Sequence, residues 1–207
     1  MTPDRNNTYR TNSEVRCADF PADDVRRKRY AFVLLARQST LKPNLKRIFD
    51  VNQSTNLAKI GTHRLVPGDC LLFGAMLDLF AESFGDPESY SNARPTPDYR
   101  QALLARTDVV ALVALAGQTV VGALVAYELP KFEQERSEFY IYDLAVAEKW
   151  RRCGIATAMI DELKTIAKAN AGWVVYVQAD YGDEPAVALY SKLGTREDVM
   201  HFDLPLD

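Results

Sequence analysis

The feature that most constrains the fold is a pair of apolar runs separated by two residues. Residues 109–116 consist only of Val, Ala and Leu, and a second run of strand length follows at 119–129. Gly117-Gln118 interrupts the apolar pattern between them. Two such runs around a short break are typical of a β-hairpin. We therefore expect an antiparallel pair of strands in the central sheet.

Helical and strand patterns lie on both sides of this hairpin. Before it, Asp69 and Thr96 stand at N-cap positions of helices expected to reach about Phe84 and Arg106, with Gly85 ending the first. After it, we expect a strand at 138–146, a helix at 154–170, a strand at 173–179, a helix at 184–193 and a last strand at 195–204. This order predicts a mixed α/β domain built on one sheet.

The charge of the chain is distributed unevenly. The 207 residues carry a formal net charge of -3, but residues 1–60 contain 12 Lys and Arg against 6 Asp and Glu. Residues 61–207 contain 13 Lys and Arg against 22 Asp and Glu. We therefore predict a basic N-terminal extension, 1–60, and one functional domain, 61–207. The negative field of that domain disfavours nucleic acid as a partner and favours a cationic small molecule.

The composition also argues against membrane and metal-dependent classes. No apolar run approaches the roughly 18 residues of a membrane helix, so we expect a cytoplasmic protein without membrane contact. Three widely spaced cysteines and two histidines, His63 and His201, do not have the spacing of a metal-ligand set. We therefore expect no bound metal.

The segment Arg151-Arg152-Cys153-Gly154-Ile155-Ala156 lies between an expected strand and an expected helix. The first N–H groups of a helix lack intrahelical partners and carry the positive end of its dipole. Gly154 and Ala156 would let a ligand approach the backbone, and the two arginines add positive charge. The segment is therefore a candidate pyrophosphate site, although a solvated helix start has the same pattern. It matches neither Walker A nor G-x-G-x-x-G.

The surroundings of this segment carry a family resemblance. Tyr142-Asp143-Leu144-Ala145-Val146 precedes it, and Ala188-Leu189-Tyr190-x-Lys192-Leu193-Gly194 follows about 35 residues later. With these segments the chain resembles the GNAT superfamily of acetyl-CoA-dependent N-acetyltransferases. Further runs at 129–134, 140–146, 176–183 and 199–203 are similar to the aminoglycoside 3-N-acetyltransferases that modify gentamicin-type antibiotics. The resemblance covers roughly residues 60–205, and residues 1–60 are expected to lie outside the catalytic domain.

The resemblance implies a GNAT acyl-CoA N-acyltransferase fold, with a mixed, mostly antiparallel central sheet flanked by helices, and a homodimer. It implies that a substrate amine attacks acetyl-CoA directly, without an acyl-enzyme, and that acetylation of the antibiotic gives resistance. A backbone N–H of residues 144–146 would stabilise the oxyanion. Tyr190 would protonate the departing thiolate, unless it is only a packed aromatic side chain. The implied acetyl-CoA-binding residues are Leu144, Ala145, Val146, Arg151, Arg152, Cys153, Gly154, Ile155, Ala156 and Thr157.

The candidates on the acceptor side are acidic or aromatic. Asp143 lies inside an apolar strand, where a carboxylate must be paired or functional, and it would accept the amine's proton or anchor the ammonium. Glu138 is either a substrate contact or an ordinary charge at a strand start. Tyr142 alternates with Asp143 and faces either the pantetheine arm or the core. Asp180 and Asp183 are candidate ligands for a polyamine, and Asp183 is also placed to cap the helix that follows.

Three functions remain open from the sequence. The leading hypothesis is an acetyl-CoA:aminoglycoside 3-N-acetyltransferase. The alternatives are a GNAT enzyme for another cationic amine, such as a polyamine or a peptide, and a non-catalytic acyl-CoA-binding module. The acidic domain favours the two enzymes, and only the resemblance separates the first from the second.

Overall fold

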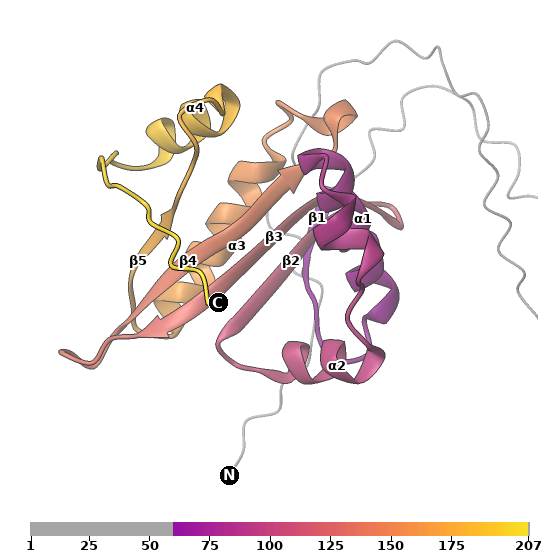
Figure 1. Cartoon of the computed structure of the whole chain (residues 1–207), viewed down its shortest axis with the longest axis horizontal. Coiled ribbons are helices and arrows are strands. Elements are labelled where there is room, and N and C mark those ends of the chain that lie inside the picture. Colours follow the sequence, from indigo (N-terminus) through magenta and orange to yellow (C-terminus); the bar gives the residue numbers. More distant parts are fainter. Residues whose placement is uncertain (1–59, 207) are drawn as a thin grey trace, which may run out of the picture.

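A computed structural model describes residues 60–206, and the centre of this part is a five-stranded sheet in the order β1-β2-β3-β4-β5 (Figure 1). The strands are β1 (Ile60–Arg64), β2 (Val109–Ala116), β3 (Thr119–Pro130), β4 (Ser137–Val146) and β5 (Gly172–Val177). The first four strands pair antiparallel, and β5 pairs parallel with β4. The expected mixed, mostly antiparallel sheet is confirmed.

Helices cover both faces of the sheet. In Figure 1, α1 and α2 lie in front of the strands at one end, and α3 runs behind them. The helices are α1 (Cys70–Phe84), the π-helical turn η1 (Glu88–Asn92), α2 (Pro97–Ala105), the 3-10 turn η2 (Glu148–Trp150), α3 (Ile155–Ala169) and α4 (Glu184–Leu193). The four longer helices all occur where the sequence predicted them.

Two of the predicted caps have the expected chemistry and one does not. The Thr96 side chain accepts the N–H of Tyr99 at 3.3 Å, and Asp183 accepts the N–H of Ala186 at 3.1 Å. Asp69 occupies the N-cap position of α1 but makes no side-chain cap hydrogen bond. Its Oδ2 atom accepts the N–H of Val66 at 2.9 Å instead. The carboxylate therefore closes the turn before α1 rather than capping the helix.

The apolar side chains form one layer on each face of the sheet. Beneath α3, the fully buried Leu112, Leu124 and Phe139 pack with Met159 and Leu163 of that helix. On the opposite face, a second cluster joins α1 and α2 to the sheet through Phe73, Met76, Phe80, Leu104, Val113, Ala123 and Ala145. Residues 109–114 are buried throughout because β2 is covered by both layers, which explains why its sequence is apolar without alternation.

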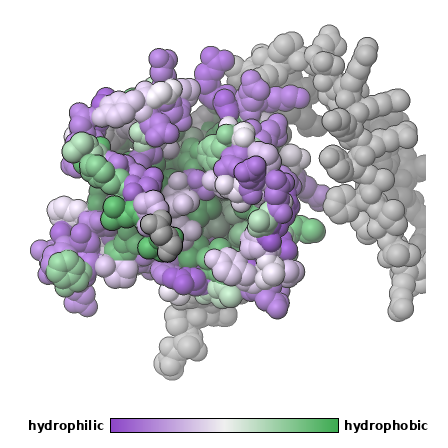
Figure 2. All heavy atoms as spheres, viewed as in Figure 1, coloured by the Kyte–Doolittle hydropathy of each residue, from purple (hydrophilic) through white to green (hydrophobic). Residues whose placement is uncertain are grey.

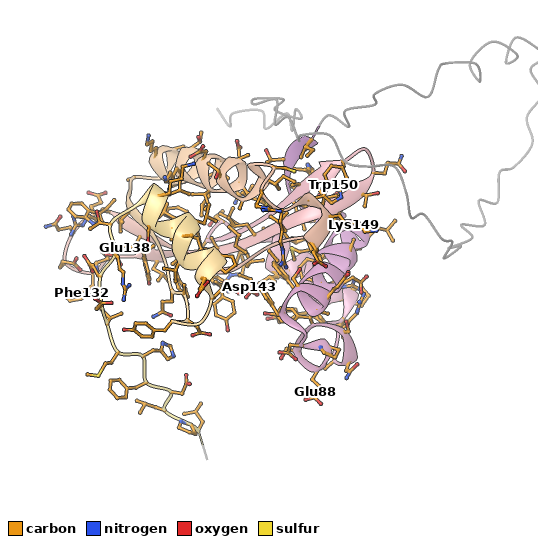
Figure 3. The ribbon with its side chains drawn as sticks, turned by 90° about the horizontal axis from the view of Figure 1, so that it is seen from above. Glu88, Phe132, Glu138, Asp143, Lys149 and Trp150 are labelled. Carbon is orange, nitrogen blue, oxygen red and sulfur yellow. The ribbon has the colours of Figure 1, made fainter. Side chains whose placement is uncertain are left out.

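The two ends of the domain differ from the sequence-based expectation. The strand β1 was not predicted, because IGTHR is short and Ile60 is its only apolar side chain of strand type. The predicted strand at 195–204 is wrong: this segment has no regular secondary structure. Its second half, 200–204, alternates in polarity, yet Met200 is 83% and Phe202 is 72% exposed. Alternation stabilises a strand only where a neighbouring strand and a covering layer are present, and this segment instead extends on the α1 side of the sheet (Figures 1 and 3).

Within residues 60–206, no helix is both long and apolar enough to cross a membrane. The same part of the chain contains no cluster of three or more His, Cys, Asp and Glu side chains arranged to hold a metal ion.

Candidate active site

A β-bulge in β4 determines which side chains reach the open face of the sheet. Val125 of β3 pairs with Asp143 and Ala126 pairs with Ile141, so Tyr142 is an extra residue without a partner on β3. Before the bulge, Phe139 and Ile141 face α3, whereas after it Leu144 and Val146 do so. The bulge therefore shifts the alternation by one residue. Tyr142 and Asp143 both lie on the α1 side, although neighbouring strand residues normally point to opposite faces.

Asp143 is held by a tyrosine that sequence reasoning did not identify. The Tyr90 hydroxyl donates a hydrogen bond of 3.0 Å to Asp143 Oδ2. Burial raises the pKa of the Asp143 carboxyl above its ordinary value, and the bond from Tyr90 opposes this rise by stabilising the carboxylate. Burial and the nearby Asp143 charge together raise the pKa of Tyr90, so this phenol stays protonated and remains a donor. Asp143 is therefore a partly desolvated carboxyl with one fixed partner.

The position of Tyr90 comes from packing around η1. Its ring lies 5.6 Å from that of Phe80 and 5.7 Å from that of Phe84, both on α1. The preceding turn is closed by Asp86, whose Oδ1 accepts the N–H of Ser89 at 3.0 Å. Tyr90 is 53 residues from Asp143 in the chain, and no local pattern in the sequence could have connected the two.

The N-terminus of α3 has the properties expected of an anion site. Gly154 stands at the N-cap in a left-handed conformation, with φ of 78°, and α3 has no side-chain cap and no acidic residue in its first turn. The N–H groups of Ile155, Ala156 and Thr157 have no intrahelical acceptor and point out of the helix start. A pyrophosphate suits such a site.

The segment before Gly154 is held against the end of β4. Arg151 Nε donates to the carbonyl of Val146 at 3.2 Å, so part of this side chain ties the loop to the strand. Arg152 is exposed and adopts a left-handed conformation, with φ of 61°. Cys153 is buried, with only 8% of its surface exposed, so it contributes packing rather than a free side chain to this loop.

The strands β4 and β5 stop pairing just before the bulge in β4. Their pairing ends at Ile141 and Val177, one residue before the bulge. The segment Leu144–Val146 continues to pair with β3 on its other edge. The backbone of this segment, where an oxyanion donor was expected, is thus held in place by β3 on one side while β5 no longer pairs with it on the other.

Tyr190 lies on α4 and packs against the core layer beneath α3. Burial, assisted by the charge of Asp183, raises the pKa of Tyr190 to about 12. The phenol therefore remains protonated at neutral pH. This state is needed by a general acid, and it is also compatible with simple packing.

The other predicted acidic residues have different surroundings. Glu138 forms an ion pair with Lys131, whose Nζ lies 3.1 Å from Oε1, and hydrogen bonding to Glu138 raises the pKa of Lys131. Asp180 and Asp183 are exposed in the turn before α4, and Asp183 caps that helix as described above. In Figure 3, Glu138 and Asp143 lie at separate places along β4.

Four tyrosines lie next to one another on the side of the sheet that carries Asp143. Tyr127, Tyr140 and Tyr176 occupy paired positions on β3, β4 and β5. The rings of Tyr140 and Tyr176 stack with centroids 5.0 Å apart, and Tyr142 lies edge-on to both Tyr127 and Tyr140. Sequence reasoning singled out only Tyr142 of these four, because the pairing register that aligns the others is a tertiary property.

Comparison with known proteins identifies the family. The model of the acetyltransferase (GNAT) family matches residues 73–195. The chain belongs to this family. Members of the GNAT family use acetyl-CoA as co-substrate, and the uncapped start of α3 lies inside the matched region. The sheet and its flanking helices are those of the GNAT fold.

Two solved structures of GNAT relatives are aminoglycoside acetyltransferases from uncultured soil metagenomic samples. HMB0005 is 50% identical, with a TM-score of 0.71, and the match covers 72% of this chain and 99% of HMB0005. The second, meta-AAC0020 in complex with trehalose, is 30% identical with a TM-score of 0.67, covering 72% of this chain and 97% of that one.

A curated relative is the N-alpha-acetyltransferase of Sulfurisphaera tokodaii, which is 30% identical over 87 residues. That alignment covers 37% of this chain and spans about half, 52%, of the archaeal protein.

Proposed function

We propose that this GNAT enzyme transfers the acetyl group of acetyl-CoA to the 3-amino group of an aminoglycoside such as gentamicin, and thereby gives antibiotic resistance. The observation that carries the chemistry is the partly desolvated Asp143 carboxyl, held by Tyr90 on the open face of the sheet. The aminoglycoside class is supported by 50% identity to HMB0005 along almost its whole length. The 3-amino position rests on the resemblance of the sequence runs at 129–134, 140–146, 176–183 and 199–203.

Acetyl-CoA supplies an acetyl thioester, and the start of α3 would hold its pyrophosphate. The uncapped N–H groups of Ile155, Ala156 and Thr157 provide donors, and the exposed Arg152 adds positive charge. Gly154 leaves the backbone open to the ligand, and Arg151 and Cys153 keep the loop against the core. A backbone N–H within Leu144–Val146 would donate to the oxyanion that forms during transfer.

Asp143 would act on the acceptor amine. An ammonium must lose a proton before it can attack, and a carboxyl whose pKa is raised by burial is a stronger base than a free aspartate. Tyr90 occupies Oδ2, so Oδ1 is the oxygen available to the amine or to a bridging water. Tyr190 would protonate the departing thiolate, because it remains a phenol at neutral pH.

The part of the aminoglycoside beyond the reacting amine would be surrounded by the other predicted substrate-binding residues, Glu138, Tyr142, Asp180 and Asp183. Glu138 already has Lys131 as its partner, so an ammonium would have to share or displace that ion pair. The two aspartates before α4 are exposed and would contribute a negative rim, as the charge of residues 61–207 suits a polycation.

The deciding experiment measures thiol release from acetyl-CoA with gentamicin, spermidine and a basic peptide offered in parallel. We expect gentamicin to have the highest kcat/KM, and NMR of the product to place the acetyl group on the 3-amino nitrogen. Higher turnover of spermidine or the peptide would contradict the aminoglycoside assignment. Acetylation at another ring nitrogen would contradict only the position. The homodimer and the cytoplasmic location also remain predictions, tested by light scattering and by cell fractionation.

A further inference from the structure

We propose that the four tyrosines on β3, β4 and β5 form a floor on which the rings of the acceptor stack, and that this floor selects ring-shaped amines over flexible ones. The tyrosine floor consists of Tyr127, Tyr140, Tyr142 and Tyr176. The inference rests on the proposed function and adds to it the part of the site that recognises the rings.

The sheet register places the tyrosine floor on one face. Tyr127 pairs with Tyr140, and Tyr140 pairs with Tyr176, so three rings lie side by side across three neighbouring strands. The residues that alternate with them, including Ala126 and Phe139, belong to the core beneath α3. The tyrosines therefore point to the other face, the side on which Asp143 meets Tyr90.

Two of the four tyrosines are exposed, on the side of the sheet along which the segment 195–206 also extends (Figure 1). Tyr142 is 60% and Tyr176 is 37% exposed. Figure 2 shows this face from the front, where both apolar and polar side chains reach the surface in the middle and mainly polar side chains lie on the flanks. Exposed aromatic side chains are costly on a free surface, and a contiguous group of them is typical of a binding site.

The ends of the floor fit a carbohydrate that carries amines. Asp143 lies next to Tyr142 at one end, and the Lys131–Glu138 ion pair lies at the other. Asp143 lies five positions after Glu138 along β4, which corresponds to about 16 Å at the usual rise. This length suits several linked sugar rings lying along β4. Sugar rings have C–H faces that pack on aromatic rings, while their amines and hydroxyls can reach the charged groups at both ends.

Linear polyamines lack such ring faces. They would bind Asp143 through charge alone, and contact with the tyrosines would add little to their binding free energy. The floor thus provides a physical basis for discrimination between two cationic substrates of similar charge.

The test compares two pairs of variants in the full-length protein. Tyr140→Leu and Tyr176→Leu keep an apolar side chain but remove the ring. Tyr140→Phe and Tyr176→Phe keep the ring and remove the hydroxyl, which for Tyr140 also removes its 2.9 Å hydrogen bond to Gln178 Oε1. Each variant is assayed for kcat/KM with gentamicin and with spermidine, and gentamicin binding is measured by calorimetry. Melting curves establish that each variant is folded.

We expect each Leu variant to lose roughly 3- to 10-fold in kcat/KM and in affinity for gentamicin, as loss of one aromatic contact predicts. Spermidine turnover should fall less than gentamicin turnover in each Leu variant, and each Phe variant, which keeps the ring, should lose less gentamicin affinity than the matching Leu variant. Unchanged gentamicin affinity in a folded Tyr176→Leu protein would overturn the proposal. Equal losses with both substrates would also overturn it, because they would indicate a general distortion of the site.

These outcomes are distinct from failure of the proposed function. If the wild type binds gentamicin without acetylating it, the reaction assignment fails while the affinities of the Leu and Phe variants still test the floor. If the wild type does not bind gentamicin at all, both the reaction and the floor are rejected.

Discussion

Replacing Asp143 by Asn separates the charge of this residue from its shape. The amide oxygen of the new side chain would still accept the hydrogen bond that the Tyr90 hydroxyl donates at 3.0 Å, so the local geometry should persist. What disappears is the negative charge and the basicity. Loss of a general base typically lowers rates by about 10²- to 10⁴-fold, and we expect kcat/KM for gentamicin to fall by about 10²-fold or more.

The pH dependence distinguishes a base from an anchor. Burial raises the pKa of Asp143, so the acidic limb of the wild-type kcat/KM profile should lie above the range of a free aspartate. The Asp143→Asn variant should lose this limb and recover partly at high pH, where solution supplies the free amine. If Asp143 only anchors the ammonium, KM should rise while kcat holds.

Stability should change in the opposite direction to activity. A carboxyl whose pKa is higher in the folded than in the unfolded state contributes stability at low pH, and this contribution is lost as the pH rises through the folded pKa. At neutral pH the carboxylate is a cost to folding, so Asp143→Asn should melt at the same temperature as the wild type or higher. Active sites often retain such destabilising groups.

A suitable control is Asp161→Asn, which makes the same chemical change at an exposed position on α3. This variant should match the wild type in both the pH–rate profile and the melting curve. An unaltered profile and an unaltered kcat/KM in Asp143→Asn would refute the reasoning and direct attention to Glu138 and Asp180.

Further predictions concern the remaining parts of the domain. Gly154→Val should weaken acetyl-CoA binding in calorimetry and spare gentamicin binding, because a branched side chain is strained at φ of 78° and blocks the start of α3. Equal affinity for acetyl-CoA would reject the pyrophosphate site. Tyr190→Phe should lower kcat by about 10²-fold with acetyl-CoA affinity unchanged, and a normal kcat under rate-limiting chemistry would return this residue to packing. Gly122→Ala should destabilise by about 1–3 kcal/mol, or roughly 2–10 °C in Tm, since its methyl would lie 2.8 Å from a side-chain carbon of α3. Gly61→Ala, with no atom within 4 Å, is the matched control and should melt like the wild type. A chain beginning at residue 58 should keep its turnover, and loss of activity in the folded, truncated protein would show that the extension contributes to the site.

The prediction of the last strand shows where sequence patterns reach their limit. Residues 200–204 alternate as a strand does, but within the described residues no strand pairs with the segment 195–204 to give it hydrogen bonds and cover. The opposite error occurred at β1, where five residues with little apolar character form a strand because β2 supplies a complete pairing register. In both cases the neighbouring element decided the outcome.

Local sequence determined the elements whose signals are contained within a few residues. The two-residue break at Gly117-Gln118 produced the hairpin, and Thr96 and Asp183 cap their helices as predicted. The start of α3 at Gly154 also followed from the sequence, because a glycine in a left-handed conformation marks the helix boundary locally. These features depend on backbone conformation and on contacts between residues close in the chain.

The tertiary structure alone decided how the acceptor site is assembled. The bulge at Tyr142 exists only relative to β3, and it brings Tyr142 and Asp143 to the same face. Tyr90 reaches Asp143 because Phe80 and Phe84 hold η1 against α1, and the tyrosine row appears only once three strands are in register. Side chains far apart in sequence meet through packing and strand pairing, which no local pattern encodes. The sequence could therefore point to Asp143, while its partner and its surroundings had to come from the fold.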